Sequence, residues 1–179
     1  MPRLKRRLIK EKKYLHIMVQ GINREKIFKK DSQKKEYIKL LKEYSEKYKI
    51  RVIAYCVMDN HVHLLVNYID IEDIIKFMQK INTIYAIYYN KNQNRVGYVY
   101  RDRYKSQVIR DQKHFINCII YIHNNPVKAQ ICNDASQYIY SSYNSLLKDK
   151  EMLMNMFFDV ELYKNMHKEG KIQENDYIE

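Results

Sequence analysis

The stretch AYCVMDNHVHLLVNY, residues 54–68, carries two histidines one residue apart inside an otherwise apolar run. Asp59 and Asn60 in its middle form a tight-turn signal, and the β-branched and aromatic residues on either side predict an antiparallel hairpin. Side chains two residues apart in a strand point to the same face. We therefore expect His61 and His63 to share one face of a sheet.

Two imidazoles on one face could supply two of the ligands of a metal ion. Neutral histidine nitrogen is a common ligand for divalent ions, and one or two further donors from a neighbouring element would complete the coordination. The alternative is a pair of partly buried histidines whose ring nitrogens bond to backbone groups. A third donor elsewhere in the chain would favour the metal site.

Other segments show the periodicity of strands and helices. They are a strand over 13–21, a helix that Asp31 caps and that runs to about residue 48, a helix from 71 to about 89, a hairpin-like segment around Gly97, a helix over 113–125 stopped by Pro126, and a peripheral helical remainder from about 141. Elements in this order predict one α+β domain. We place it at residues 1–148, followed by an acidic, helical C-terminal appendage at 149–179.

The charge is unevenly distributed along the chain. The 179 residues include 33 Lys and Arg against 21 Asp and Glu, a net charge of +12. Residues 149–179 hold eight acids and four lysines, which leaves about +16 on residues 1–148. A basic folded domain favours a polyanionic partner such as nucleic acid. Compositional drift in an AT-rich genome would also enrich lysine, but it does not explain this concentration.

Basic and aromatic residues alternate in NKNQNRVGYVYRDRYKSQVIR, residues 90–110. Cations neutralise phosphates and aromatic faces stack on exposed bases, so this mixture suits single-stranded nucleic acid. A basic hairpin whose tyrosines fill the core is the alternative. The tyrosines concerned are Tyr98, Tyr100 and Tyr104, and the interleaved cations are Arg95, Arg101, Arg103 and Lys105.

The cysteine content and the hydropathy of the sequence indicate in which cellular compartment the protein is found. Cys56, Cys118 and Cys132 are odd in number and lack CxxC spacing, which indicates neither a disulfide framework nor a thiolate zinc cluster. The basic N-terminal residues precede an apolar run too short for a signal peptide, and no run approaches the ~20 residues of a membrane span. We expect a soluble cytoplasmic protein, nucleoid-associated and without a membrane partner.

The segment KHFINCIIYIHNNPVKA, residues 113–129, supplies the candidate third donor. Tyr121 and Asn125 are four residues apart, so a phenol and an amide oxygen lie one helical turn from each other. If their face lies over the histidine pair, Asn125 could bind the metal and Tyr121 could reach an atom bound to it. The alternative is a tyrosine anchored by its hydroxyl and an asparagine capping the helix before Pro126. The polar stripe comprises His114, Asn117, Tyr121 and Asn124 or Asn125, and the apolar stripe Phe115, Cys118, Ile119 and Ile122.

Four motifs, in order and spacing, resemble the REP-associated tyrosine transposases and related IS200-like single-tyrosine transposases of the His-hydrophobic-His nuclease superfamily. They are MDNHVHLLV, GYVYRDRYKSQVI, YIHNNPVKA and YIYSSY. The resemblance covers about residues 14–144. The family usually has proline where this chain has Asp59, a substitution in the turn that leaves the histidines in place.

The resemblance implies a role for each matching residue. His61 and His63 would bind Mg²⁺ or Mn²⁺, Asn125 would be the third ligand, and Tyr121 would be the catalytic nucleophile. The implied fold is an antiparallel sheet of ferredoxin or RNA-recognition type with helices on its faces. The implied activity is cleavage and rejoining of single-stranded DNA beside a hairpin, by a monomer or a homodimer. The expected DNA contacts are Arg101, Arg103, Tyr104, Lys105 and Lys128.

Two other functions compete with a transposase. The first is a non-catalytic module that binds single-stranded nucleic acid, with tyrosines for stacking and histidines as relics. The second is a zinc hydrolase that uses the histidine pair with Cys56 or His114, although Asp59 in the turn is its only candidate general base. His16 on the first strand is interpreted as structural, and His123 as pointing away from Tyr121.

Overall fold

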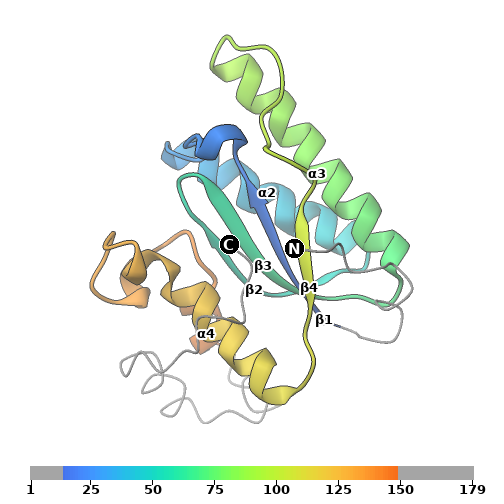
Figure 1. Cartoon of the computed structure of the whole chain (residues 1–179), viewed down its shortest axis with the longest axis vertical. Coiled ribbons are helices and arrows are strands. Elements are labelled where there is room, and N and C mark those ends of the chain that lie inside the picture. Colours follow the sequence, from blue (N-terminus) through green and yellow to red (C-terminus); the bar gives the residue numbers. More distant parts are fainter. Residues whose placement is uncertain (1–13, 149–179) are drawn as a thin grey trace.

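The computed structural model describes residues 14–148, in which four strands form one antiparallel sheet (Figure 1). The strands are β1 (Tyr14–Gln20), β2 (Arg51–Val57), β3 (His61–Asn67) and β4 (Lys105–Val108), in the spatial order β2-β3-β1-β4. Helix α2 (Asp31–Lys47) joins β1 to β2, and α3 (Ile71–Asn92) joins β3 to β4. This β-α-β-β-α-β order is the ferredoxin-like arrangement that RNA-recognition domains also use, so the predicted α+β fold class is confirmed.

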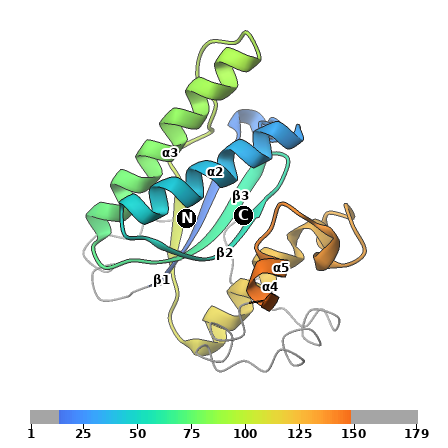
Figure 2. The same cartoon turned by 180° about the vertical axis from the view of Figure 1, so that it is seen from behind.

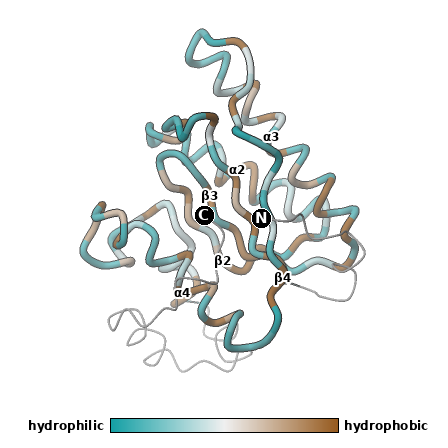
Figure 3. The backbone as a smooth tube through the Cα atoms, in the orientation of Figure 1, coloured by the Kyte–Doolittle hydropathy of each residue, from teal (hydrophilic) through white to brown (hydrophobic). Residues whose placement is uncertain are grey.

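The central strands β1 and β3 are buried on both faces. Each has five consecutive buried residues, whereas β4 at the edge of the sheet is polar and partly exposed. Hydrophobic residues accordingly concentrate in the central strands, whereas hydrophobic and hydrophilic residues alternate along the helices (Figure 3). A sheet covered on both sides explains why the histidines lie within an apolar run, because both faces of their strand lie inside the protein.

Helices α2 and α3 cover one face of the sheet (Figure 2). Aromatic rings fill the space between them. The ring of Phe28 lies 5.1 Å from that of Tyr37 and 4.8 Å from that of Tyr85, between centroids. The Tyr85 hydroxyl donates to the Ile27 carbonyl over 2.7 Å, which satisfies the only polar atom of that side chain. This face is the main apolar core.

The start of α2 differs from the prediction that Asp31 caps it. Lys30 occupies the N-cap position, and its backbone N–H donates to Oε1 of Gln33 over 2.8 Å. Asp31 is instead the first helical residue. There its carboxylate still favours the helix, because the first turn carries the positive end of the helix dipole.

Helix α4 (Gln112–Lys128) packs against β2 and β3 on the other face of the sheet. It continues through Pro126, so the prediction that this proline stops the helix was wrong. A proline removes one backbone hydrogen bond, here the one to the Ile122 carbonyl four residues earlier, and the helix continues for two residues beyond it. The Ile131 N–H then donates to the Pro126 carbonyl over 2.9 Å and closes the helix end.

The segment 93–104 does not form the hairpin that was predicted around Gly97. It is a bent connection in which Gly97 has a φ of 99°, a conformation that glycine adopts without strain. The chain then returns beside the end of β1, where the Arg101 N–H donates to the Gln20 carbonyl over 3.0 Å. The strand that follows, β4, therefore pairs with β1 rather than with a neighbour in sequence.

The segment 138–142 lies along the outer edge of β2. The Val57 N–H donates to the Tyr140 carbonyl over 3.0 Å, and the Tyr55 N–H donates to Oγ of Ser142 over 2.9 Å. These bonds protect an edge strand that would otherwise present unpaired backbone groups. Helix α5 (Tyr143–Lys148) follows and buries Tyr143, so this part of the remainder is packed rather than peripheral. The appendage predicted at 149–179 lies outside the described residues.

Truncation of a buried and of an exposed residue of α3 should lower the free energy of unfolding by different amounts. Phe77 is fully buried, whereas Ile87 on the same helix is 65% exposed. Phe77→Ala should lower the free energy of unfolding by about 3–5 kcal/mol, because it removes buried apolar area and leaves a cavity. Ile87→Ala should change it by less than about 0.5 kcal/mol. Urea unfolding measures both, and equal losses would contradict the assigned burial.

Candidate functional site: a histidine pair beneath a tyrosine

The strand register places both histidines of the hairpin on the sheet face that α4 covers. His63 is opposite Met18 on β1 and Cys56 on β2, and His61 is opposite Gln20. Paired residues of antiparallel strands point to the same face. The alternation predicted from the sequence therefore holds. His16 belongs to the same face because it lies two residues before Met18 on β1.

His16 forms a direct contact with His63. Its Nε2 lies 3.0 Å from Nδ1 of His63, and the two rings stack with centroids 5.1 Å apart. Both side chains are buried. His16 was predicted to be structural, and its contact with His63 was not predicted. The available signal was a single polar residue in the middle of the apolar run YLHIMV, a position where a buried side chain requires a partner.

His61 lies on the same face of the sheet, at the start of β3. Its Nδ1 lies 2.7 Å from Oδ1 of the preceding residue, Asn60. The His61 ring is 4.9 Å from the His63 ring between centroids, and the two planes are nearly perpendicular. His61 is only partly buried, so the pair extends from the interior toward solvent.

The donor set fits a divalent metal. In His61 and in His63 the Nδ1 atom is engaged by a neighbouring side chain, so Nε2 is the nitrogen that would bind an ion. Histidine ligands commonly use one ring nitrogen for the metal and the other for a hydrogen bond that fixes the ring. Two such imidazoles, with an oxygen donor from α4, match the mixed nitrogen and oxygen coordination that divalent ions accept.

Burial keeps the two inner imidazoles neutral. Burial lowers the pKa of His63 well below its ordinary value, and the nearby His16 and His61 lower it further. Burial also lowers the pKa of His16, to about 3, with a contribution from His114 and an opposing one from a hydrogen bond with Gln107. A neutral imidazole is the form that binds metals.

Helix α4 brings Tyr121 onto the histidines. The Tyr121 ring lies 5.3 Å from the His63 ring and 5.8 Å from the His16 ring between centroids, in edge-to-face geometry with both. Only 5% of Tyr121 is exposed. The residue predicted as the nucleophile therefore lies over His63, one of the residues predicted as metal ligands, and over His16.

Asn125 follows Tyr121 by one turn and is partly buried. Its Nδ2 donates to the Tyr121 carbonyl over 2.8 Å. This bond uses the amide nitrogen and turns the side chain along the helix, so the amide oxygen is the atom that would serve as a ligand. The role of Asn125 as third ligand stays a prediction.

Cations predicted to contact DNA border this site. Lys128 Nζ lies 5.2 Å from the centre of the Tyr121 ring. Lys105 on β4 is opposite Met18, which is itself opposite His63, so the three residues form one row across the sheet. Arg101 Nη1 donates to Oε1 of Gln20, the register partner of His61, over 3.4 Å.

The aromatic residues of segment 98–104 divide between surface and interior. Tyr98 is 83% exposed, as a base-stacking residue would be. The Tyr100 hydroxyl is buried, and burial raises the pKa of this side chain well above its ordinary value. Tyr104 is partly buried, whereas Arg103 beside it is exposed. The exposure of Tyr98 is compatible with stacking on bases, which stays a prediction, whereas Tyr100 fits the alternative of a tyrosine in the interior.

The donors required for a zinc hydrolase are not assembled. Within residues 14–148, no three side chains of His, Cys, Asp or Glu form a group that could hold a metal. Cys56 is buried, and burial raises the pKa of its thiol, which disfavours the thiolate that zinc prefers. Asp59, the candidate general base, instead forms an ion pair of 2.8 Å with Lys34.

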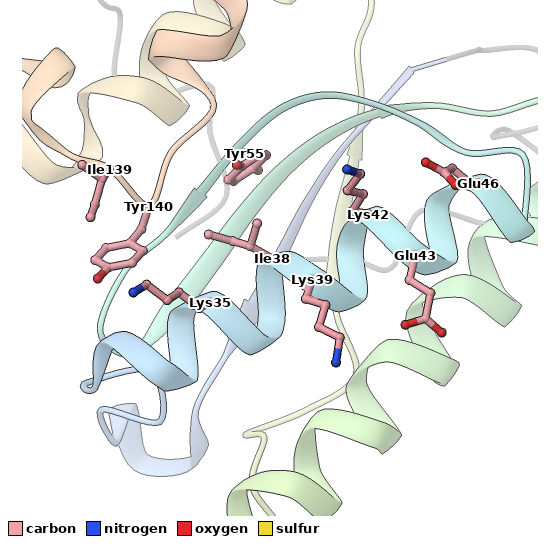
Figure 4. A pocket seen from close by; sticks show the side chains of 9 residues that line it. All are labelled: Lys35, Ile38, Lys39, Lys42, Glu43, Glu46, Tyr55, Ile139 and Tyr140. Atoms are coloured by element: carbon pink, nitrogen blue, oxygen red, sulfur yellow. The ribbon is translucent and has the colours of Figure 1, made fainter.

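A separate surface groove of about 580 Å³ opens between α2 and residues 139–140 (Figure 4). Tyr55 of β2 lines it, and Tyr55 pairs with Leu64. These residues alternate with Cys56 and His63 along their strands, so the groove lies on the opposite face of the sheet from the histidines. The described residues that line it include three lysines but no histidine. The groove is therefore distinct from the candidate site.

Comparison with known proteins identifies the class. The family model described as Transposase IS200 like matches residues 9–125. The chain therefore belongs to the IS200-like transposase family, a family of DNA-processing enzymes. None of the helices in residues 14–148 is both long and apolar enough to cross a membrane.

One curated relative and two solved structures resemble this chain. The chain is 27% identical over 123 residues to the Haemophilus influenzae (strain ATCC 51907 / DSM 11121 / KW20 / Rd) protein named "Putative REP-associated tyrosine transposase", covering 63% of this chain and 70% of that one. The solved REP-associated tyrosine transposase bound to a REP hairpin shares the fold, with a TM-score of 0.62 at 14% identity over 83% of each chain. A Deinococcus radiodurans transposase structure aligns at a TM-score of 0.46 and 17% identity, over 72% of this chain and 88% of that one.

The neutral state of His16 predicts a pH dependence of stability. Its pKa is 6.5 in an ordinary environment and about 3 in the folded protein, so the unfolded chain binds a proton between these values that the folded protein does not. The free energy of unfolding should therefore fall as pH drops below 6.5, by up to about 1.4 kcal/mol per pH unit. Unfolding titrations between pH 5 and 6.5 avoid most carboxylate protonation. The decline should be shallower in His16→Gln, and identical slopes would contradict the assignment.

Proposed function

We propose that this protein cleaves and rejoins single-stranded DNA beside a hairpin through a covalent 5′-phosphotyrosine intermediate at Tyr121. The observation that carries the proposal is the position of the Tyr121 ring, 5.3 Å from His63 and 5.8 Å from His16 between centroids. A tyrosine over His63 would stand beside a metal ion bound by that histidine. A purely structural tyrosine would not require that arrangement of donors beneath it.

The proposed reaction is a transesterification. Tyr121 Oη attacks the scissile phosphorus, the phenol proton passes to solvent or to a neighbouring base, and the bond from phosphorus to O3′ breaks. One product is a 5′-phosphate esterified to Tyr121, and the other is a strand with a free 3′-OH. The phosphotyrosine conserves the bond energy, so attack by a 3′-OH in the reverse direction rejoins DNA without ATP.

His61, His63 and Asn125 would hold Mg²⁺ or Mn²⁺. Such an ion, when bound, polarises the scissile phosphate and orients it for in-line displacement. The described residues contribute the rest. The Lys128 ammonium group, 5.2 Å from the Tyr121 ring centre, favours the negative charge that develops on the phenol oxygen. The burial of Tyr121 limits access of water, which would otherwise compete as a nucleophile.

The proposed substrate is single-stranded DNA that folds into a hairpin. The basic character of residues 1–148 supports a nucleic-acid partner, and the similar fold of the transposase solved with a REP hairpin supports the hairpin. The exposed side chains of Arg101, Arg103 and Lys105 and that of Lys128 would contact phosphates. Arg101 and Arg103 lie in the segment before β4, Lys105 begins β4, and Lys128 ends α4, so the DNA strand would run between these elements across the site.

Replacement of the nucleophile provides the first functional test. Tyr121→Phe removes only the hydroxyl, so folding and hairpin binding should survive while strand cleavage and the covalent adduct disappear. The assay incubates protein with folded single-stranded DNA from the flanks of its own gene and Mn²⁺, then separates products on a denaturing gel. Tyr44→Phe, on α2 at the other face of the sheet, is the matched control and should retain the adduct. Wild-type protein that binds the hairpin without cleaving it would instead support a non-catalytic binding module.

Removal of a histidine tests the metal site. His61→Ala and His63→Ala should each abolish cleavage in Mg²⁺ or Mn²⁺ while hairpin affinity changes less than about threefold, because phosphate contacts to cations dominate binding. His61→Ala is the more informative variant, because His61 is only partly buried and its replacement should disturb folding less. Gel-shift titrations measure binding, and unfolding midpoints verify that each variant is folded. Parallel loss of binding and cleavage would show that the histidines are structural.

Neutralisation of the basic segment tests the DNA path. Arg103→Ala with Lys105→Ala should weaken binding and flatten its salt dependence, by about 0.7 in the slope of log K against log salt for each lost phosphate contact. The control replaces Lys76 and Lys80, exposed residues of α3 on the far side of the sheet. Fluorescence anisotropy at several salt concentrations gives the slopes. If both double variants have the wild-type slope, segment 101–105 does not contact DNA.

A further inference from the structure

We infer that His16 is a positioning residue that, together with Gln107, fixes the tautomer of His63 so that Nε2 of His63 faces the metal. This inference rests on the proposed metal site and adds a function for two residues outside it. Neither residue would touch the metal or the DNA.

The contact between the two histidines crosses the sheet diagonally. The register partner of His63 on β1 is Met18, and His16 lies two residues earlier. Diagonal neighbours on one face are within reach of long side chains. His16 Nε2 and His63 Nδ1 approach to 3.0 Å, and the rings are tilted by only 26°. The contact is therefore a hydrogen bond between ring nitrogens in a buried, nearly parallel stack.

The hydrogen bond contains one proton, and metal binding decides which ring donates it. A neutral imidazole carries one N–H, and its other nitrogen has a lone pair. If His63 uses the Nε2 lone pair for a metal, its proton must be on Nδ1. His63 Nδ1 then donates to Nε2 of His16, and the proton of His16 must be on its own Nδ1.

Gln107 is placed to accept that second proton. It is the register partner of His16 on β4. Oε1 of Gln107 and Nδ1 of His16 are both buried, and the Gln107 side chain raises the pKa of His16, which is the effect of an acceptor beside its ring. A glutamine oxygen can only accept. With Oε1 of Gln107 toward His16, the order Gln107, His16, His63 has one consistent assignment of protons, and that assignment leaves the Nε2 lone pair of His63 for a metal.

Burial makes this arrangement necessary. His63 is only 2% exposed and His16 is fully buried, so water cannot readily replace a lost partner. Without an acceptor at Nδ1, His63 would gain by moving its proton to Nε2, because a buried N–H without a partner is costly. That tautomer has no lone pair toward the metal. Outer-shell partners of this kind change metal affinity about 10–100-fold when removed.

Two substitutions of His16 distinguish its role as an acceptor for His63 from the contribution of its ring to packing. A glutamine side chain ends at about the reach of imidazole Nε2, whereas an asparagine side chain ends at about the reach of Nδ1. His16→Gln should therefore keep an acceptor for His63, and His16→Asn should not. Both replacements are uncharged amides, and both remove the same aromatic ring. Unfolding midpoints establish that each variant is folded at the temperature used.

The first readout is the affinity for Mn²⁺ alone, measured by electron paramagnetic resonance without DNA. His16→Asn should weaken Mn²⁺ binding about 10–100-fold, and His16→Gln should stay within about threefold of wild type. The second readout is the tautomer of His63 in metal-free protein, from long-range ¹H–¹⁵N correlation spectra. Wild type and His16→Gln should carry the proton on Nδ1, and His16→Asn should shift it toward Nε2.

Several results would overturn the inference. They are equal Mn²⁺ affinity in wild type and His16→Asn, equal loss in the two variants, or a wild-type His63 protonated on Nε2. If His16→Asn does not fold, Gln107→Leu replaces it, since Gln107 is only partly buried on the edge strand. This variant should also weaken Mn²⁺ binding and mix the tautomers, and an unchanged affinity would count against the inference.

The two proposals fail separately. No DNA is present in the metal and tautomer measurements, so an absence of strand cleavage would contradict the proposed function and leave these results intact. Conversely, cleavage that depends on Tyr121 together with wild-type Mn²⁺ affinity in His16→Asn would support the proposed function and refute the role of His16.

Discussion

The register between β1 and β3 is the constraint on which both the core and the site depend. In this register Met18 lies opposite His63 and Ile17 lies opposite Leu64. A shift of one residue would exchange the faces of every side chain in the shifted strand. It would move His16 into the apolar core under α2 and α3, away from His63 and Gln107. The hydrophobic pattern that secures the core therefore also secures the distance between His16 and His63.

The site combines two environments that are usually separate. His16 and His63 are buried in the middle of a sheet, while His61 and Lys128 reach solvent. A buried charge would be costly, and the lowered pKa values of the inner imidazoles avoid that cost by keeping them neutral. Positive charge stays at the rim, where it can meet phosphate. Neutral buried imidazoles with cations at the rim suit a reaction in which metal ligands lie beneath a polyanionic substrate.

Local sequence patterns predicted the elements and the histidine pair. The turn at residues 59–60 defined the hairpin, and alternation placed His61 and His63 on one face. Helical spacing placed Tyr121 and Asn125 on one side of α4. These features depend on residues close together in the chain, so periodicity was enough to find them.

Other features depend on tertiary contacts and could not be read from local patterns. The partner of His16 is 47 residues away, and only the sheet order brings the two together. Segment 93–104 returns to the end of β1 instead of forming a hairpin, and residues 105–108 then pair with the edge of β1.

The most direct test of the account is to locate the covalent bond to DNA. Wild-type protein would react with a hairpin-containing single strand and Mn²⁺, followed by nuclease trimming, proteolysis and tandem mass spectrometry. The account predicts a residual 5′-linked nucleotide on Tyr121 in the peptide that contains YIHNNP. A nucleotide on another tyrosine, or a cleaved strand with no protein-linked nucleotide, would contradict it.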